Sequence, residues 1–298
     1  MKEFFVDFQF YIVDVFTEHS CEGNPLAVII GSEFPSTKRM QEIAFEMNFS
    51  ETVFIINKIN SNQAYPIKIF TPSREIEFTG HPLLGAAWVI LNKSSSENEH
   101  LYLDTAIGKI LITRDRKKPN LLWFRAPKIE IREAINSVTS LPGLENLDCE
   151  IDKKLPIQIA SAGTSAILVP IKKLAVLENI KFDKDLFSDF DNFKLPKLIY
   201  FFCFETYKKS NDICVRFFFD ADGLREDIAT GNGAAFLAKY LKDNLIFSES
   251  DFSFAIEQGH NLKRPSIIFV KGKMLDGFDV IDIGGHVSPT ISDGKILI

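Results

Sequence analysis

Short apolar segments separated by turn residues run along the chain and predict a strand-rich fold. Residues 8–16, 26–30, 51–56 and 67–70 have the length and the β-branched or aromatic content of strands. Residues 82–91 are apolar almost all round, which predicts a helix buried in the middle of its domain. The proline at its start is tolerated because the first turn of a helix does not use that N–H group.

A second, amphipathic helix is expected over residues 36–47. Ser36 is suited to an N-cap, and Met40, Ile43, Ala44 and Met47 recur at a spacing that places them on one helical face. The order up to residue 91 is therefore strand, loop, strand, helix, strand, strand, helix. A hairpin around Gly108 and a strand over residues 121–125 complete the first half.

The second half repeats this order. The expected counterparts of the first-half elements are strands at residues 156–160, 167–169, 198–204 and 214–219, a weaker helical segment within 177–193, a buried helix at 232–241, and closing strands at 252–257, 266–270 and 278–283. Two long copies indicate duplicated domains rather than a repeat array. We expect an N-terminal domain at residues 1–125, a C-terminal domain at 126–282, and a tail, 283–298, that returns to the first domain.

Two similar motifs, 151 residues apart, open the two buried helices. The first is Thr79-Gly80-His81-Pro82 and the second is Thr230-Gly231-Asn232-Gly233. Each follows an acidic residue and begins a run of small and apolar residues. Helix N-termini attract anions through their exposed N–H groups and the helix dipole. The repeat therefore predicts a site for an anionic substrate, with an enzyme as the leading hypothesis.

Charge and composition narrow the class of protein. A net charge of −6 without a long basic block argues against nucleic acid as a partner, and no apolar run is long enough to cross a bilayer. Acidic residues interrupt the N-terminal segment, which is unlike a signal peptide. We therefore expect a cytoplasmic protein whose partner is a small anionic metabolite.

The sequence predicts neither a metal ion nor an organic cofactor. The four cysteines lack paired spacing, the five histidines lack ligand spacing, and the glycine-rich pieces do not form a dinucleotide-binding fingerprint. Cys203 and Cys214 lie in strand-like runs and are expected to be buried packing thiols.

The two halves differ at acidic positions. Glu51 begins a strand and has no counterpart in the second half, whereas Asp227 comes shortly before the second glycine motif. A carboxylate on each side of a cleft could remove and return a proton. The alternative for Glu51 is a solvated acid at the start of a strand.

His81 follows a glycine at the start of a buried helix. A helix N-terminus lowers the pKa of a histidine and favours its neutral form, which can donate or accept a hydrogen bond. A capping or core histidine is the alternative.

A series of motifs in a fixed order resembles the phenazine-biosynthesis isomerase family, also called PhzF-like. These motifs are Asp14-Val15-Phe16-Thr17, Gly23-Asn24-Pro25-Leu26-Ala27-Val28, Met40-Gln41-Glu42-Ile43-Ala44, Asn48-Phe49-Ser50-Glu51-Thr52, Phe70-Thr71-Pro72, Glu75-Ile76-Glu77-Phe78-Thr79-Gly80-His81-Pro82, Glu226-Asp227-Ile228-Ala229-Thr230-Gly231, Gln258-Gly259 with Lys263-Arg264-Pro265-Ser266, and Gly284-Gly285. The resemblance covers nearly the whole chain.

The resemblance implies an α+β fold like that of diaminopimelate epimerase, with two pseudo-repeated domains, each a curved, barrel-like sheet around a central helix. It also implies an inter-domain active site, a homodimer, and isomerase chemistry without metal or organic cofactor. Matched by motif, Glu51 would move the proton, with His81 and Asp227 as further catalytic residues. The substrate-binding residues would be Gly80, Thr230, Gly231, Asn232 and Gly233.

Two positions depart from the family pattern. Asn232 stands where members often carry serine, and Ile228 stands where they usually carry proline. An amide is longer than a hydroxyl and adds donors, so the substrate can differ from that of the phenazine enzyme.

Two alternatives of the same fold remain open. Cysteine-type racemases and epimerases place a thiol at the N-terminus of each central helix, where the dipole activates it. The matching positions here are Thr79 and Thr230, neither of which is a competent acid or base. A non-catalytic metabolite-binding protein that kept the cleft is the second alternative.

Overall fold

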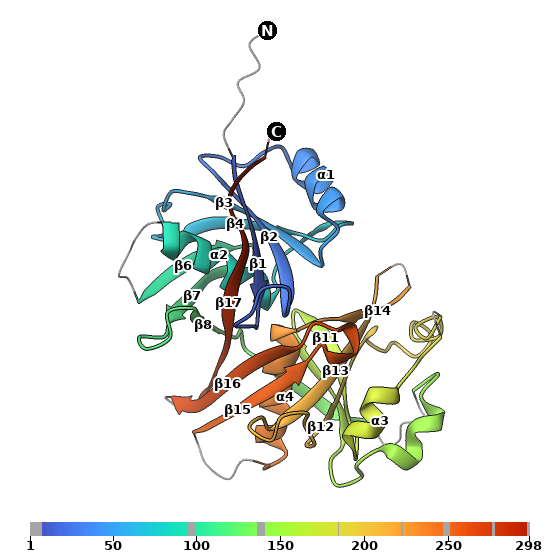
Figure 1. Ribbon diagram of the computed structural model, residues 1–298. Coiled ribbons are helices and arrows are strands. Elements are labelled where there is room, and N and C mark those ends of the chain that lie inside the picture. Colours follow the sequence, from blue (N-terminus) through green and yellow to red (C-terminus); the bar gives the residue numbers. More distant parts are fainter. Residues whose placement is uncertain are drawn as a thin grey trace. The chain divides into compact units, whose positions relative to one another are not determined.

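The computed structural model describes residues 8–93, 99–135, 141–183, 185–221, 223–246, 251–275 and 278–296 (Figure 1). The chain divides into two compact units, one of Met1–Arg125 with Gly284–Ile298 and one of Ala126–Ile283. Among the residues described, no helix is long and apolar enough to cross a membrane.

The first unit alternates strands with two helices, in the order that the sequence predicts. Its elements are β1 (Phe8–Val15), β2 (Asn24–Gly31), α1 (Thr37–Met47), β3 (Glu51–Ile56), β4 (Tyr65–Phe70), β5 (Glu75–Ile76), α2 (Gly80–Lys93), β6 (His100–Thr105), β7 (Gly108–Arg114), β8 (Leu121–Arg125) and most of β17 (Phe278–Ile296). Residues 297–298 of the expected tail lie outside the described residues.

The strands of the first unit close into a ring. Strands β8, β7, β6, β4, β3, β2 and β1 pair in turn. Strand β17 completes the ring by pairing antiparallel with β1, where Val287 lies opposite Val15, and also with β8. The predicted barrel-like sheet is therefore confirmed, and its last strand comes from the end of the chain.

Helix α2 is the central helix of this ring. Every residue from Gly80 to Leu91 is buried, and α2 contacts β1, β2, β3, β6, β7 and β8. A Cβ atom on Gly85 would lie 2.4 Å from Cδ2 of Leu26, so glycine is needed for this close approach. The all-round apolar pattern predicted this burial correctly.

Helix α1 packs on the other face of the sheet. The Ser36 side chain accepts a hydrogen bond from the Arg39 N–H at 3.2 Å, which confirms the predicted N-cap. Met40 and Ile43 pack in a cluster that also contains Phe54 and Phe70. The two sides of the sheet thus carry different helices, so residues that alternate along β3 have different surroundings.

The second unit has the same kinds of elements. They are β9 (Glu130–Ile135), the 3₁₀-helix η2 (Glu145–Glu150), β10 (Ile157–Ala162), β11 (Thr164–Pro170), α3 (Leu174–Asn179), β12 (Leu198–Cys203), β13 (Ile213–Asp220), β14 (Leu224–Asp227), α4 (Gly231–Asp243), β15 (Phe252–Gln258), the 3₁₀-helix η3 (His260–Leu262), β16 (Ser266–Leu275) and the first residues of β17.

Strand pairing in the second unit follows the order of the first. Strands β10, β11, β12, β13, β15 and β16 repeat the pairing of β1, β2, β3, β4, β6 and β7, including the parallel pairs β11–β12 and β13–β15. Helix α4 takes the place of α2 and contacts β9, β10, β11 and β16. Two copies of one topology account for the internal repeat.

The segment 177–193 differs from the expected helix. Among the described residues of this region, Leu174–Asn179 forms the one helix, and those from 185 to 194 form successive turns. Backbone bonds such as Phe190 N–H to Phe187 O close these turns, and both phenylalanines are buried in the core. Leu186, Phe190 and Phe193 recur at a helical spacing, so the pattern favours a helix, but burial of Leu186, Phe187 and Phe190 in the core holds this segment in turns instead.

Candidate functional site

Glu51 lies at the start of β3, on the side of the sheet that faces α2. It pairs in register with Leu26 of β2, and Leu26 packs against Gly85 of α2. Residues directly opposite each other on paired strands point to the same face. The Glu51 side chain is 14% exposed, which argues against the alternative of a solvated acid.

His81 is the second residue of α2 and lies against Glu51. Its Nε2 atom is 3.4 Å from Oε2 of Glu51, and its side chain is 3% exposed. Burial lowers the pKa of His81 to about 3, which keeps the imidazole neutral near pH 7. The contact is therefore between a neutral ring and a carboxyl group rather than between two charges.

The N-terminus of α2 adds a partial positive charge beside this pair. Gly80 is the first residue of the helix, and the first turn contains no acidic side chain. The Glu51 carboxyl group, a neutral donor or acceptor, and helix N–H groups consequently gather at one end of a buried helix. Such a group can hold an anion and exchange a proton with it.

In the second unit, Asp227 ends β14 and is bound to the residue that precedes α4. The Thr230 hydroxyl donates to Oδ2 of Asp227 at 2.5 Å. Thr230 is the N-cap residue of α4, but its side chain does not cap the helix. The first turn of α4 contains no acidic residue either, so the helix dipole at Gly231 to Gly233 is not offset by a carboxylate of that turn.

Gln258 holds the loop between Asp227 and α4. Its Nε2 donates to the Asp227 carbonyl oxygen and to Oγ1 of Thr230, each at 3.1 Å, and its Oε1 accepts the Thr230 N–H at 3.1 Å. Because Nε2 of Gln258 donates to the Thr230 hydroxyl, that hydroxyl is directed to donate to Asp227. Gln258 is 1% exposed, and we had not predicted its role from the sequence.

Asn232 and Gly233 define the first turn of α4. A Cβ atom at position 233 would lie 2.4 Å from the ring of the buried Tyr200, which explains the second glycine of the motif. Asn232 is half-buried, and its side chain has no hydrogen bond to any part of the chain that the structure describes. Its amide is therefore available to a ligand.

The predicted site residues thus form two groups, one in each unit. Gly80 and His81 lie with Glu51, and Thr230, Gly231, Asn232 and Gly233 lie with or directly after Asp227. That the two groups meet in one cleft stays a prediction.

The thiols do not lie where a cysteine-type racemase needs them. Cys203 and Cys214 lie within β12 and β13, and burial raises the pKa of Cys203 to about 11 and that of Cys214 further. Within the described ranges, no cluster of three or more histidine, cysteine, aspartate or glutamate side chains could hold a metal ion.

Comparison with known proteins identifies the family. The model of the phenazine biosynthesis-like protein family matches residues 13–291. The chain belongs to this family. The trans-2,3-dihydro-3-hydroxyanthranilate isomerase of Pseudomonas chlororaphis is 30% identical over 97% of this chain and 99% of its own length. An uncharacterized isomerase of Clostridium acetobutylicum is 29% identical over 89% of each chain. We assign the protein to the isomerases of this family.

Solved structures show the same fold. A PhzF-family phenazine biosynthesis protein of Bacillus anthracis matches with a TM-score of 0.84 at 23% identity, over 98% of this chain and 99% of the other. A hydroxyproline epimerase of Agrobacterium vitis matches with a TM-score of 0.66 at 13% identity, over 98% and 92%. The epimerase-like fold expected from the motifs is confirmed.

Proposed function

We propose that the protein is a cofactor-independent isomerase that moves a proton within a small carboxylate-bearing metabolite. The observation that carries the proposal is the contact between Glu51 and the neutral His81 at the N-terminus of α2. A largely buried carboxyl group next to an uncharged hydrogen-bonding partner is suited to accept a proton and return it.

In this mechanism the Glu51 carboxylate removes a proton from a carbon of the substrate. The electron pair of that C–H bond moves into the conjugated system of the substrate, and a second carbon then takes the proton back from Glu51. The atoms of the substrate are unchanged in number, so no oxidant or co-substrate is required. His81 orients the Glu51 carboxyl group through their 3.4 Å contact and remains neutral throughout.

The two helix N-termini would bind the carboxylate of the substrate. Neither α2 nor α4 has an acidic residue in its first turn, so both dipoles favour an anion. Asn232 would supply side-chain donors, and Asp227, held by Thr230, would orient a polar group of the substrate. The proposal requires Glu51 and Asp227 to act on the same substrate molecule.

Incubation with a panel of carboxylate metabolites in deuterated water tests this function. The panel includes trans-2,3-dihydro-3-hydroxyanthranilate, because the relative from Pseudomonas chlororaphis is named for it. We expect new C–D bonds in at least one compound. Glu51→Gln should lower the exchange rate by roughly 10²–10⁴-fold, the usual contribution of general acid–base catalysis.

Glu46→Gln is the matched control, because it makes the same charge change on the exposed face of α1 and should leave the rate within about twofold. Exchange that persists in Glu51→Gln would disprove the role of Glu51. Exchange that stops on thiol alkylation of the folded protein would favour a cysteine-type racemase. Tight binding of a metabolite without any exchange would favour a binding protein.

A further inference from the structure

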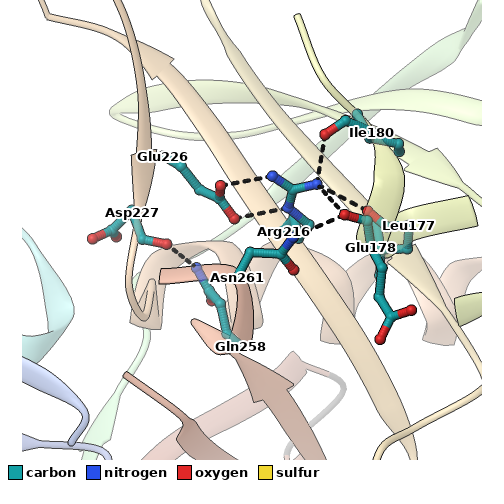
Figure 2. A network of polar contacts seen from close by, with 8 residues as sticks. All are labelled: Leu177, Glu178, Ile180, Arg216, Glu226, Asp227, Gln258 and Asn261. Atoms are coloured by element: carbon teal, nitrogen blue, oxygen red, sulfur yellow. Dashed lines mark hydrogen bonds and ion pairs between the residues drawn. The ribbon is translucent and has the colours of Figure 1, made fainter. Parts of the chain in front are cut away.

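Glu226 and Asp227 are neighbours on β14 whose side chains point to opposite sides of the sheet (Figure 2). Asp227 lies opposite Phe217 of β13, and Phe217 in turn lies opposite Tyr200, whose ring packs against Gly233 of α4. Asp227 is therefore on the α4 side. Glu226 lies opposite Phe218, which belongs to the hydrophobic cluster on the other side.

Arg216 of β13 binds Glu226 through one edge of its guanidinium group, formed by Nε and Nη2. Its Nε and Nη2 atoms donate to Oε1 and Oε2 of Glu226, each at 2.8 Å. Arg216 is 8% exposed, and its guanidinium carbon lies 4.8 Å from the centre of the Phe218 ring. A bidentate pair of this kind fixes the direction of the Glu226 side chain as well as its distance, because two parallel N–H···O bonds hold the guanidinium and carboxylate groups in one plane.

The other amino group of Arg216, Nη1, binds the C-terminal end of α3. Its Nη1 atom donates to the carbonyl oxygens of Leu177 at 3.0 Å, Glu178 at 3.3 Å and Ile180 at 2.7 Å. The last carbonyls of a helix lack partners within the helix, so a cation there is favourable. One side chain therefore connects three segments, namely β13, β14 and the end of α3.

A second set of contacts reaches Asp227 from the same region. Asn261 of η3 donates to the Glu178 carbonyl oxygen at 2.8 Å, and Gln258, three residues earlier, donates to the Asp227 carbonyl oxygen at 3.1 Å. Figure 2 shows this group of residues around Arg216. The backbone before Asp227 is thus fixed by the bound Glu226 side chain, and the Asp227 carbonyl group is fixed by Gln258.

Stability alone is a weak reason for such a pair. Replacing a buried ion pair with apolar side chains of similar volume is often neutral or stabilising, because removing two charges from water is costly. A bidentate ion pair fixes the direction of the strand that carries it, and an apolar pair does not. Catalytic groups depend on such support, since a shift of about 1 Å can cost roughly 10²-fold in rate.

We propose that Arg216 is a positioning residue that acts through Glu226 to hold Asp227 at the N-terminus of α4. This inference rests on the proposed function, since it assigns Asp227 a role in turnover. Arg216 does not touch the substrate. Its effect is to fix the end of β14, so that the Thr230 and Asp227 side chains keep the direction in which they meet the substrate.

The test compares two conservative variants with a matched control. Arg216→Lys keeps the charge and loses the planar fork, and Glu226→Gln keeps the shape and loses the charge. Arg225→Lys is the control, because Arg225 is an exposed residue of the same short strand whose Nε donates only to the Ala221 carbonyl oxygen among the described contacts. Each variant is measured by hydrogen exchange of peptides covering residues 224–230 and 234–241, and by kcat and KM in the deuterium assay.

We expect Arg216→Lys to speed hydrogen exchange at residues 224–230 and leave residues 234–241 unchanged. It should lower kcat roughly tenfold or more, and change KM by less than about threefold, because the helix N-termini that bind the anion are untouched. Glu226→Gln should act in the same direction, and Arg225→Lys should stay within about twofold of wild type. A merely structural pair would lower the amount of folded enzyme and leave kcat per folded molecule unchanged.

Unchanged exchange at residues 224–230 in both variants would overturn the proposal, and so would faster exchange with kcat equal to that of the control. If Arg216→Lys fails to fold, Glu226→Gln decides between these outcomes. If wild-type protein turns over no candidate substrate, the proposed function fails, and the exchange rates alone then decide whether Arg216 anchors Asp227.

Discussion

At the scale of single residues, His81 has a consequence for stability that can be measured without a substrate. Its pKa in the folded protein is about 3, against an ordinary value of 6.5, because burial disfavours the charged ring. Between these two values the unfolded chain binds a proton and the folded chain does not. Stability is therefore fully present above pH 6.5 and is lost as the pH falls toward 3.

We expect His81→Gln to weaken the acid sensitivity of the fold. From pH 7 to pH 4, His81 should account for a fall of about 3 kcal/mol in the free energy of unfolding, at 1.36 kcal/mol per pKa unit. Urea unfolding at several pH values measures this slope. His100→Gln, at an exposed position of β6, is the control and should leave the slope as in wild type. Equal slopes for His81→Gln and wild type would contradict full burial of a neutral ring.

The residues that the sequence could identify are those whose position in a pattern is unusual. Glu51 was recognisable because the repeat has no matching acid, and His81 because it opens an all-apolar helix. Arg216 gave no such signal, and Gln258 stood out only as part of the Gln258-Gly259 motif, which assigned it no role. A polar residue in a strand is usually solvated, and only the tertiary contacts with Thr230 and Glu226 reveal that these two are buried and bound.

At the scale of elements, the turn after β15 supports the loop that carries Asp227. Gly259 has a φ of +83°, and a Cβ atom there would lie 2.3 Å from the Arg264 carbonyl oxygen and 2.7 Å from that of Ile228. Gly163 has nearly the same φ, +81°, but no atom lies within 4 Å of a Cβ at that position. A side chain at position 163 would therefore meet backbone strain alone, whereas one at position 259 would meet both strain and a steric clash.

Alanine at these two positions should have different costs. Gly163→Ala should destabilise the protein by about 1–2 kcal/mol, the cost of a left-handed conformation for a residue with a Cβ atom. Gly259→Ala should cost about 1–3 kcal/mol more, because backbone atoms must move. Thermal unfolding of the two variants measures the difference. Equal losses would show that the turn after β15 yields without strain.

The sequence predicted strands with clearly bounded apolar runs well, whereas it missed β14 and misjudged the segment 177–193. The bounds of β3 and β8 agree with the expected residues 51–56 and 121–125, because apolar runs with turn residues at both ends fix them. Strand β14 has four residues and only half-buried or exposed side chains, so no periodicity marks it. The helical segment expected within 177–193 was wrong, because tertiary burial of Phe187 and Phe190 holds turns instead.

At the scale of the whole molecule, β17 connects the end of the chain to its beginning. It pairs with β1 across the ring of the first unit, from Phe8 opposite Ile296 to Val15 opposite Val287. Removing residues 286–298 should expose one edge of β1 and remove hydrogen-exchange protection from those N–H groups of residues 8–15 that face β17, while the groups that face β2 stay protected. Strands β10 to β13 should stay protected, because their pairings are internal to the second unit. Protection of residues 8–15 equal to that of the full chain would contradict the ring.

The ring also has a consequence for the order of events during synthesis. The strand that closes the first unit follows the second unit along the chain, so β1 lacks one neighbour until the second unit has been synthesised. Pairings between residues more than 270 positions apart form slowly, because the intervening loop must close first. The second unit, although translated later, completes its internal pairings earlier. Until β17 pairs, the unpaired edge of β1 is a place where the nascent chain can pair with a wrong strand.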